Sequence, residues 1–340
     1  MKAVGYTKPQ AIAASDALLD IELPEPIALG RDLLVEVKAI SVNPVDTKVR
    51  ASAQPADGEP YKVLGWDASG VVRAVGPDVS LFKPGDSVWY AGSIARPGTN
   101  SELHLVDERI VGHAPKSLDF AQAAALPLTT ITAWEMLFDR FEVPVGKRPH
   151  GKSLLIIGAS GGVGSILTQL ASRMTALTVI GTASRPETQA WVRELGAHHV
   201  IDHSKPIAEE LRRIGFPSVD YIAGLTKTDV HLAQIVEAIA PQGKFALIDD
   251  PGVLDANVFK RKAVSIHWEL MFTRSLFGTP DMIAQHHLLN EVAAMVDAGL
   301  IRTTLAERGG TINAANLKQA HALIESGTAR GKVVLEGWGH

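Results

Sequence analysis

The chain has 340 residues, which corresponds to about two domains at roughly 150 residues per domain. Hydrophobic residues make up 46% and charged residues 21% of it, as in ordinary globular proteins, which argues against a disordered, collagen-like or coiled-coil chain. Its 33 Lys and Arg face 37 Asp and Glu without a concentrated basic tract, so we expect no nucleic-acid partner. The absence of cysteine excludes disulfides, iron–sulfur ligation, thiol nucleophiles and thiolate zinc sites.

No segment of the sequence resembles a targeting signal or a membrane span. The first ten residues contain Lys2, Lys8 and Pro9 but no apolar core of signal-peptide length. Two stretches lack charge, residues 120–134 and 153–172, but the first contains a proline and several threonines and the second contains four glycines. We therefore expect a cytoplasmic protein that does not associate with membranes.

Residues 1–116 show short strands and turns. Residues 34–42 alternate at period two, with Val35, Val37 and Ala39 on one face, which predicts a half-buried strand. Turn-forming residues lie at 43–44, 55–58, 76–78, 83–86 and 97–98. Their spacing predicts a mostly β domain, a small barrel or sandwich with long loops.

After residue 119 predicted helices alternate with predicted strands. The helices cover residues 121–138, 163–174, 187–195, 207–214 and 229–240, and the strands 153–157, 177–183, 199–202, 219–222 and 244–248. Such alternation predicts a doubly wound parallel sheet. A strand at 263–268, helices at 281–298 and 314–325 and a strand at 333–335 follow, and we expect the last strand to return to the first domain.

A glycine-rich turn joins the apolar strand 153–157 to the next helix. It consists of Gly158 followed by Ala159, Ser160, Gly161, Gly162, Val163 and Gly164. Gly161 lets the backbone approach a pyrophosphate, Gly164 lets the helix lie close to the strand, and the helix N–H groups attract an anion. Ala159 stands where the first glycine of the motif is usual, and a tight turn without a ligand is the alternative, yet the context favours a dinucleotide site.

The next strand ends in a pattern that favours NADPH over NADH. The usual NAD marker is an acid at this position, which binds the ribose 2′-hydroxyl. Here Ser184 and Arg185 follow the strand, and a hydroxyl and a guanidinium can bind a 2′-phosphate. The alternative is that Ser184 only caps the helix entered through Pro186 and that Arg185 is solvated.

The chain resembles the medium-chain dehydrogenase/reductase superfamily over nearly its whole length, and most closely its zinc-free quinone oxidoreductase branch, members of which often carry a zinc-type alcohol dehydrogenase-like label. Beside the glycine turn, the resemblance rests on SVNPVDT (41–47), LGWDASGVV (64–72), KPGDSV (83–88), AALPL (124–128) with TAW (132–134), and AHHVIDH (197–203). It implies an α/β protein in which residues 1–126 and 282–340 form a GroES-like, β-rich substrate domain. Residues 127–281 would form a Rossmann domain that binds NADPH. It also implies a homodimer, for which residues 263–268 are the candidate edge strand.

Resemblance also raises the question of zinc. The catalytic-zinc ligand positions of the alcohol dehydrogenase branch fall on Asn43, Trp66 and Leu128, none of which suits zinc, and the four-cysteine structural lobe is missing. We therefore expect no metal. A substitute site made from Asp46, Asp67 and a histidine is the alternative left open.

Several site residues follow from the resemblance alone. Asn43 and Asp46 would line the cleft near the nicotinamide, where Thr130 or Thr132 would approach it, and His203 would reach the adenosine end. The alternatives are an Asn-Pro turn for Asn43, a structural hydrogen bond for Asp46 and a surface position for His203. A substrate pocket is expected from the aromatic and histidine side chains Trp66, Tyr90, His267 and Trp268, with help from Phe272. Tyr90 or Tyr61 is a candidate proton donor.

The sequence thus predicts an NADPH-dependent reductase that transfers hydride to a small-molecule quinone or α,β-unsaturated carbonyl without zinc. Asn43, Asp46, Thr130 and Tyr90 are the candidate catalytic residues. Two rival functions stay open: an enoyl-thioester reductase, which needs a long groove and a basic patch for its carrier, and a non-catalytic NADPH-binding protein, sensor-like or crystallin-like.

Overall fold

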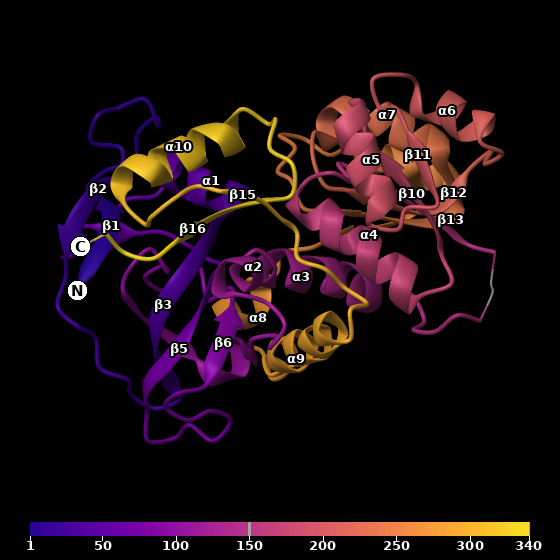
Figure 1. The fold of residues 1–340 in the computed structure, drawn as a ribbon. Coiled ribbons are helices and arrows are strands. Elements are labelled where there is room, and N and C mark those ends of the chain that lie inside the picture. The colour runs from indigo at the N-terminus through magenta and orange to yellow at the C-terminus, as the bar shows by residue number, and fades with distance from the viewer. Residues whose placement is uncertain (149–150, 340) are drawn as a thin grey trace. The chain divides into compact units, whose positions relative to one another are not determined.

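The computed structural model describes residues 1–148 and 151–339 (Figure 1). The chain divides into two compact units, residues 1–131 with 272–340 and residues 132–271. The predicted domain division after residues 126 and 281 stays a prediction. Here the first unit runs on to Ile131, inside the helix α3 (Pro127–Trp134), where no loop marks a boundary in the sequence.

The first unit is built on two sheets. Its strands are β1 (Lys2–Tyr6), β2 (Leu19–Glu22), β3 (Asp32–Val42), β4 (Lys62–Val63), β5 (Ala68–Val75), β6 (Ser87–Tyr90), β7 (Leu103–Asp107), β8 (Val111–His113), β15 (Leu305–Arg308) and β16 (Lys332–Glu336). The main sheet has the order β15-β16-β3-β5-β6-β8 with β7 also paired to β3, and the small sheet has the order β2-β1-β4. Because β16 pairs antiparallel with β3, the predicted return of the last strand to the first domain is confirmed.

Strand β3 shows why this half of the chain forms a sheet. The alternation predicted for it is present, since Val35, Val37 and Ala39 are buried while Glu36 and Lys38 are only partly covered. From residue 39 onward every residue of the strand is buried, and over this stretch β16 pairs with β3 on the side opposite β5. The end of β3 is therefore deep inside the unit.

The helices of the first unit correct two predictions. They are α1 (Pro44–Ser52), α2 (Phe120–Ala124), α3, α8 (Thr273–Phe277), α9 (Ala284–Asp297) and α10 (Ala314–Glu325), with a short 3₁₀ helix at Glu108–Ile110. Asn43-Pro44, predicted as a turn, instead begins α1, where proline fits the first helical position because its missing N–H is not needed there. The single helix predicted over 121–138 is wrong: Pro127 separates α2 from α3, and a π-helix follows at Glu135–Arg140.

The second unit is the predicted doubly wound sheet. Its parallel strands are β9 (Ser153–Ile157), β10 (Thr178–Thr182), β11 (His199–Ile201), β12 (Val219–Gly224), β13 (Ile239–Leu247) and β14 (Ser265–Trp268), in the order β11-β10-β9-β12-β13-β14. Its helices are α4 (Gly162–Met174), α5 (Pro186–Glu194), α6 (Ile207–Arg213) and α7 (Thr228–Ala238), with a 3₁₀ helix at Ala256–Lys262. The strand order reverses between β9 and β12, which is where open α/β sheets bind ligands.

Among the boundaries in this unit that differ from the predictions, two have a clear cause in the backbone. The helix predicted to run to residue 240 ends at Ala238, and β13 begins at Ile239 rather than at residue 244, since Pro241 disfavours a helical conformation at the residue before it. The strand predicted from residue 263 begins at Ser265, because Ala263 has a left-handed backbone (φ +51°). The predicted α/β class, a β-rich domain plus a Rossmann-type domain, is confirmed.

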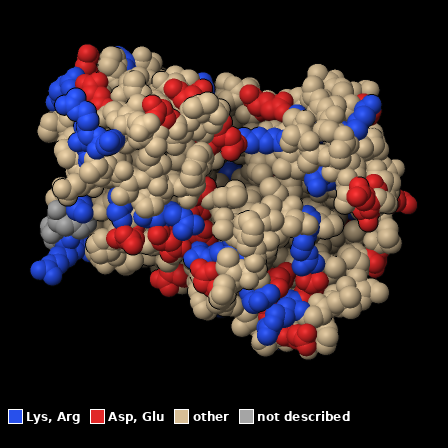
Figure 2. Space-filling model, turned by 180° about the vertical axis from the view of Figure 1, so that it is seen from behind, with Lys and Arg blue, Asp and Glu red and all other residues tan. Residues whose placement is uncertain are grey.

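The sheet of the second unit is enclosed by apolar side chains. Leu155, Ile180, Ile222 and Phe245 belong to one buried cluster on four neighbouring strands. Within the part of the chain that is described, no helix is long and apolar enough to cross a membrane. On the face shown in Figure 2, basic and acidic side chains are interspersed and form no continuous basic surface.

Candidate functional site

The glycine turn lies at the carboxyl end of β9, where the order of the strands reverses. Gly158 takes a left-handed conformation (φ +86°), so the tight turn uses this glycine, one residue before the position that Ala159 occupies. A Cβ on Gly164 would lie 2.3 Å from the carbonyl oxygen of Gly158 and 2.6 Å from Cα of Ala159. Helix α4 therefore touches the turn backbone to backbone, which only glycine permits.

The residues between these two contacts form an open cradle. Ser160, Gly161, Gly162 and Val163 are partly exposed. Among the described residues, apart from the chain neighbours of Gly161, only the Gly158 carbonyl oxygen lies within 4 Å of the place a Cβ on Gly161 would take, at 3.5 Å. Gly161 is the N-cap of α4, so the first N–H groups of the helix lie at the cradle without helical partners. The cradle therefore fits the phosphates of a dinucleotide. Ala159 is fully buried and packs toward Gly181 of β10.

After the end of β10, a basic and an acidic side chain lie close together beside Ser184. Ser184 and Arg185 are both exposed, and Arg185 Nε forms an ion pair with Glu187 (3.2 Å). The alternative in which Ser184 caps the helix is not supported, because α5 begins at Pro186 and its N-cap is Arg185. The hydroxyl of Ser184 and the guanidinium of Arg185 thus both lie at the carboxyl edge of the sheet.

His203 has a neighbour that the sequence did not indicate. It follows β11, and its ring lies perpendicular to that of His231 on α7, with 6.2 Å between the ring centres. Nδ1 of each histidine is buried and has no hydrogen-bond partner among the described residues. Burial and the charge of Lys227 lower the pKa of both imidazoles, so both stay neutral near pH 7.

In the first unit a buried polar cluster surrounds the carboxylate of Asp67. Oδ2 accepts hydrogen bonds from Ser41 Oγ (2.8 Å), Asn43 Nδ2 (2.9 Å) and Lys332 Nζ (3.0 Å). Oδ1 accepts from the amide of Leu128 (2.9 Å). None of these four polar side chains is more than 2% exposed. The ends of β3, β5 and β16 and the start of α3 therefore meet at a single carboxylate.

Sequence reasoning missed Lys332 and considered Asp67 only as a metal ligand. Lys332 precedes a run of β-branched residues, and a lysine there is usually exposed at the strand end. Its burial follows from the position of β16 in the sheet, between β15 and β3. In the sequence, only its place at the start of an otherwise apolar strand could have indicated that Lys332 belongs to the site.

Zinc does not fit this cluster. Of the three family ligand positions, Asn43 is hydrogen-bonded to Asp67 and Lys332, the Trp66 indole donates to the Ser93 carbonyl (3.2 Å), and Leu128 offers only its backbone. Asp67, the nearest anionic oxygen donor, is already paired with an ammonium. The described residues contain no group of three His, Asp or Glu side chains that could hold a metal, so the substitute site left open above has no ligand set there.

Asp46 stands in the first turn of α1 beside this cluster. Its Oδ2 accepts a hydrogen bond from the Asn43 amide (2.7 Å), while its Oδ1 is buried and has no hydrogen-bond partner among the described residues. Burial raises the pKa of Asp46 to about 7, against the opposing effects of the Asn43 amide and the Lys332 charge. Such a carboxyl group can both give and take a proton near neutral pH.

The two candidate threonines of α3 differ. The hydroxyl of Thr130 is fully buried and has no partner in the described part of the chain, whereas that of the neighbouring Thr129 donates to the Leu126 carbonyl (3.1 Å). Thr132 lies in the second unit and is also buried, but it has an interaction partner. Thr130 is therefore the threonine whose hydrogen-bonding capacity is left for a bound molecule.

The aromatic candidates fall into separate groups. Trp66 and Phe272 pack edge to face, with ring centres 6.1 Å apart. Tyr90 is fully buried, and its hydroxyl lies 3.1 Å from His104 Nδ1, while His104 Nε2 lies 3.0 Å from the Pro97 carbonyl. Because a carbonyl only accepts and burial lowers the pKa of His104 to about 4, Nε2 carries the imidazole proton and Tyr90 donates to Nδ1. A proton from Tyr90 would require breaking this bond.

The other two predicted pocket residues are on β14, in the second unit. His267 lies edge to face with Phe141 (6.4 Å between ring centres), and Trp268 is 54% exposed. Their place in a substrate pocket stays a prediction.

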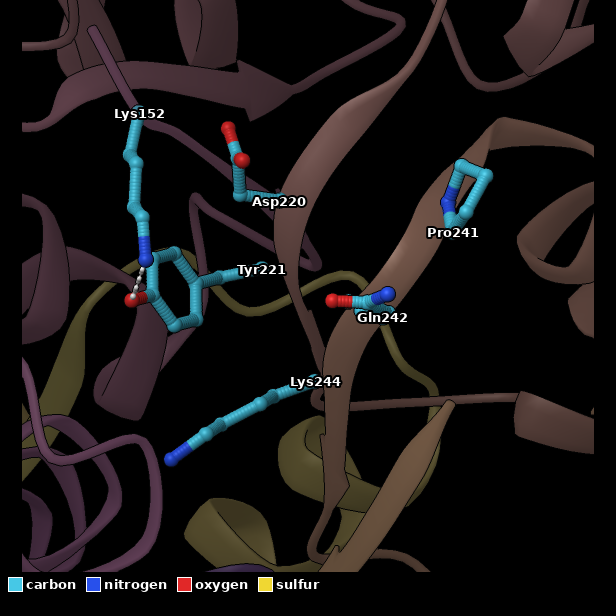
Figure 3. A pocket seen from close by; sticks show the side chains of 7 residues that line it. Lys152, Asp220, Tyr221, Pro241, Gln242 and Lys244 are labelled. Carbon is cyan, nitrogen blue, oxygen red and sulfur yellow. Dashed lines mark hydrogen bonds between the residues drawn. The ribbon is translucent and has the colours of Figure 1, made fainter. Parts of the chain in front are cut away.

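A hollow in the second unit lies at the opposite end of its sheet (Figure 3). It is lined by Lys152, Asp220, Tyr221, Pro241, Gln242, Gly243 and Lys244. Lys152 precedes β9, and the other residues lie in the first half of β12 and in β13 up to Lys244, away from the glycine turn. Lys152 donates to the Tyr221 hydroxyl (3.3 Å), Asp220 accepts from Ser153, and Lys244 pairs with Glu142. The hollow is therefore not part of the cradle.

Comparison with known proteins adds two domain matches and two relatives. Residues 30–117 match the alcohol dehydrogenase GroES-like domain, and residues 195–335 match a zinc-binding dehydrogenase domain. A zinc-type alcohol dehydrogenase-like protein of Staphylococcus aureus is 41% identical, with 98% of this chain and 99% of the relative covered. The human mitochondrial NAD(P)H oxidoreductase RTN4IP1 is 32% identical, with 89% of this chain and 81% of the relative covered.

Solved structures agree with these matches. A Rhizobium etli protein assigned to the zinc-dependent alcohol dehydrogenases is 63% identical, with a TM-score of 0.96 and coverage of 100% of this chain and 99% of that one. A quinone oxidoreductase of Pseudomonas syringae is 25% identical, with a TM-score of 0.84 and coverage of 99% of each chain.

Proposed function

Because the chain belongs to the medium-chain dehydrogenase/reductase superfamily and is therefore an oxidoreductase with a nicotinamide cofactor, we propose that it is an NADPH-dependent, zinc-independent reductase of quinones or α,β-unsaturated carbonyls. The observation that carries the proposal is the cluster around Asp67. The family positions for zinc hold Asn43, Trp66 and Leu128, and the nearby carboxylate is paired with Lys332. A carbonyl here would have no metal to polarise it, so the acceptor must be activated by its own conjugation.

The cradle and the end of β10 support NADPH as the cofactor. The cradle offers backbone N–H groups to the pyrophosphate, and Ser184 with Arg185 offers a hydroxyl and a guanidinium to a 2′-phosphate. Glu187 competes for Arg185, so the preference for NADPH over NADH is moderate rather than absolute. His203 and His231 supply neutral rings for the adenosine end.

NADPH, when bound, supplies a hydride to the electron-poor carbon of the acceptor. The residues of the chain have the remaining tasks of binding, orientation and proton supply. Thr130 has a free hydroxyl to orient a bound group, and Asp46 has a carboxyl group that is protonated in a large fraction of molecules near pH 7. We assign Asp46 the delivery of the proton that the enolate or quinol oxygen requires after hydride transfer, directly or through water.

We further propose a homodimer formed through β14. This strand is at the edge of the parallel sheet, so its outer hydrogen-bonding groups are available to another strand. Trp268 and Leu270, 54% and 50% exposed, provide apolar surface beside it. A second copy of the chain would cover both features.

The proposal is tested by following the loss of reduced-nicotinamide absorbance with protein dialysed against a chelator. NADPH and NADH are compared with a quinone, an enone, an enoyl thioester and a simple aldehyde. We expect turnover of the quinone or enone, faster with NADPH, and no dependence on added zinc. Turnover of the thioester alone supports the enoyl-thioester reductase, and tight NADPH binding without turnover supports the non-catalytic binding protein. Zinc-dependent turnover of the aldehyde refutes the proposal.

A further inference from the structure

Lys332 is a fully buried ammonium at the centre of the cluster in the first unit. It is 2% exposed and donates to the Val42 carbonyl (3.1 Å), to Asp67 Oδ2 (3.0 Å) and to Asn43 Oδ1. We propose that Lys332 is the built-in cation of this centre, in contact with Asn43, one of the three family positions for zinc ligands, and a positioning residue that fixes the side chain of Asn43. This inference rests on the proposed zinc-independent reduction.

The three N–H donors of Lys332 determine how the side-chain amide of Asn43 is oriented. An ammonium has three N–H groups and no acceptor, and all three have partners here. Because Lys332 only donates, the Asn43 atom that faces it must be Oδ1, and Nδ2 must face Asp67 and the Ser41 carbonyl. The amide of Asn43 therefore has a single orientation, although an isolated asparagine side chain can turn by 180° at little cost.

The same contacts show how Lys332 acts. Since its three donors are used, Lys332 is not available to touch a substrate, so its effect must pass through Asn43 and Asp67. Asn43 is also the N-cap of α1, and its backbone N–H donates a hydrogen bond to the carboxylate of Asp46. Lys332 thus holds the residue that positions the proposed proton donor. Its charge also lowers the pKa of Asp46, against the effect of burial.

A metal would compete with this arrangement. A divalent cation at Asp67 would lie within a few ångströms of the ammonium and would have to displace it, since like charges in a buried site repel strongly. The cluster is also complete as it is, because both oxygens of Asp67 already accept hydrogen bonds. The resident positive charge makes zinc binding unfavourable even where an oxygen ligand is present.

Two variants test the positioning role. Lys332→Met leaves Asp67 buried without its counter-charge and is expected to lower stability so far that it is uninformative alone. The double variant Asp67→Asn with Lys332→Met removes both charges together, which keeps the fold because no buried charge is left unpaired. In the double variant, the Leu128 N–H needs the oxygen of the new amide at position 67 as its acceptor, so the NH2 group of that amide faces Asn43, which must turn its own amide oxygen toward it. Lys83→Met, on an 81% exposed lysine, is the matched control.

We expect the double variant to melt within a few degrees of the wild type, to bind NADPH within threefold of its affinity, and to lose at least tenfold in kcat on the quinone. A double variant with full kcat shows that Lys332 only neutralises Asp67 and overturns the positioning role, as does one that loses NADPH affinity and kcat together. Lys83→Met should match the wild type in every assay.

Metal analysis tests the cation role without measuring activity. After dialysis against zinc and then metal-free buffer, the wild type should retain less than a tenth of an equivalent of zinc per chain by mass spectrometry. Retention of one equivalent overturns the proposal. If wild-type protein turns over no quinone or enone, the proposed function fails, but the metal analysis and the affinity of the double variant for NADPH still decide whether Lys332 is the cation of the centre.

Discussion

Gly161 and Gly164 are three residues apart in one turn, and we predict that their replacement by alanine has different effects: Gly164→Ala lowers stability, whereas Gly161→Ala weakens NADPH binding. A Cβ at position 164 would lie 2.3 Å from the Gly158 carbonyl oxygen, whereas contacts under 3.0 Å are not tolerated, so helix α4 must retreat by about 1 Å. Overpacking against the backbone costs about 1–3 kcal/mol. For a unit of this size that lowers the melting temperature by about 3–10 °C.

For Gly161→Ala we expect the opposite: little loss of stability and weaker binding of NADPH. Its Cβ would meet nothing closer than 3.5 Å and its φ of −75° is ordinary for alanine, so stability should fall by no more than about 1 kcal/mol, the cost of alanine at an N-cap. The methyl group would instead fill the space that a pyrophosphate needs. We expect NADPH affinity to fall about tenfold or more, which is about 1.4 kcal/mol.

Calorimetry of the free protein and titration of NADPH fluorescence measure the two effects separately. Gly164→Ala should shift the melting temperature, and Gly161→Ala should shift mainly the dissociation constant. Wild-type NADPH affinity in Gly161→Ala would show that the phosphates do not bind at this turn. An unchanged melting temperature in Gly164→Ala would show that the helix does not depend on backbone contact with the turn.

Further predictions concern the remaining site residues. Arg185→Ala should weaken NADPH about tenfold and leave NADH unchanged, while Glu187→Gln should strengthen NADPH, as measured by their dissociation constants. Thr130→Val should keep the melting temperature and lower kcat/KM about tenfold, whereas Thr129→Val, which loses a hydrogen bond, should cost about 1 kcal/mol of stability. Because the pKa of Asp46 is about 7 when folded and near 4 when unfolded, its folded state holds the extra proton between these values. Stability should therefore fall as pH rises from about 4 to 7, by at most about 1.4 kcal/mol per unit, and Asp46→Asn should remove this slope in thermal melts. Trp268→Glu should convert the dimer to a monomer in analytical ultracentrifugation, and a dimer that survives would exclude β14 from the interface.

The sequence correctly predicted the fold class, because the fold class depends on the local periodicity of apolar residues. The alternation in β3 and the repeated strand and helix signals of the second unit gave the fold class, because burial of one face sets the period of each element. Several of the boundaries that failed depend on prolines. Pro127 broke a predicted helix and Pro44 began an unpredicted one, since the effect of a proline depends on its position relative to the first helical turn.

The site was only partly predictable because half of it depends on long-range pairing. The glycine turn is contiguous in the sequence, so its geometry could be read from seven residues. The cluster around Asp67 joins residues separated by 26, 61 and 265 positions, and no local pattern shows that these side chains meet. His231 is a similar case, since it lies on α7 after β12 whereas His203 follows β11, and these two strands are not neighbours in the sheet.

The place of Lys332 in the sheet also constrains when this protein can become active during synthesis. The carboxylate of Asp67 is made early, but its counter-charge arrives 265 residues later, after the whole second unit has left the ribosome. Until β16 is inserted beside β3, the carboxylate of Asp67 has no counter-charge from Lys332 and the main sheet lacks this strand. The contiguous second unit can fold before that point, so the ability to bind nucleotide should precede the ability to reduce a substrate in every newly made chain.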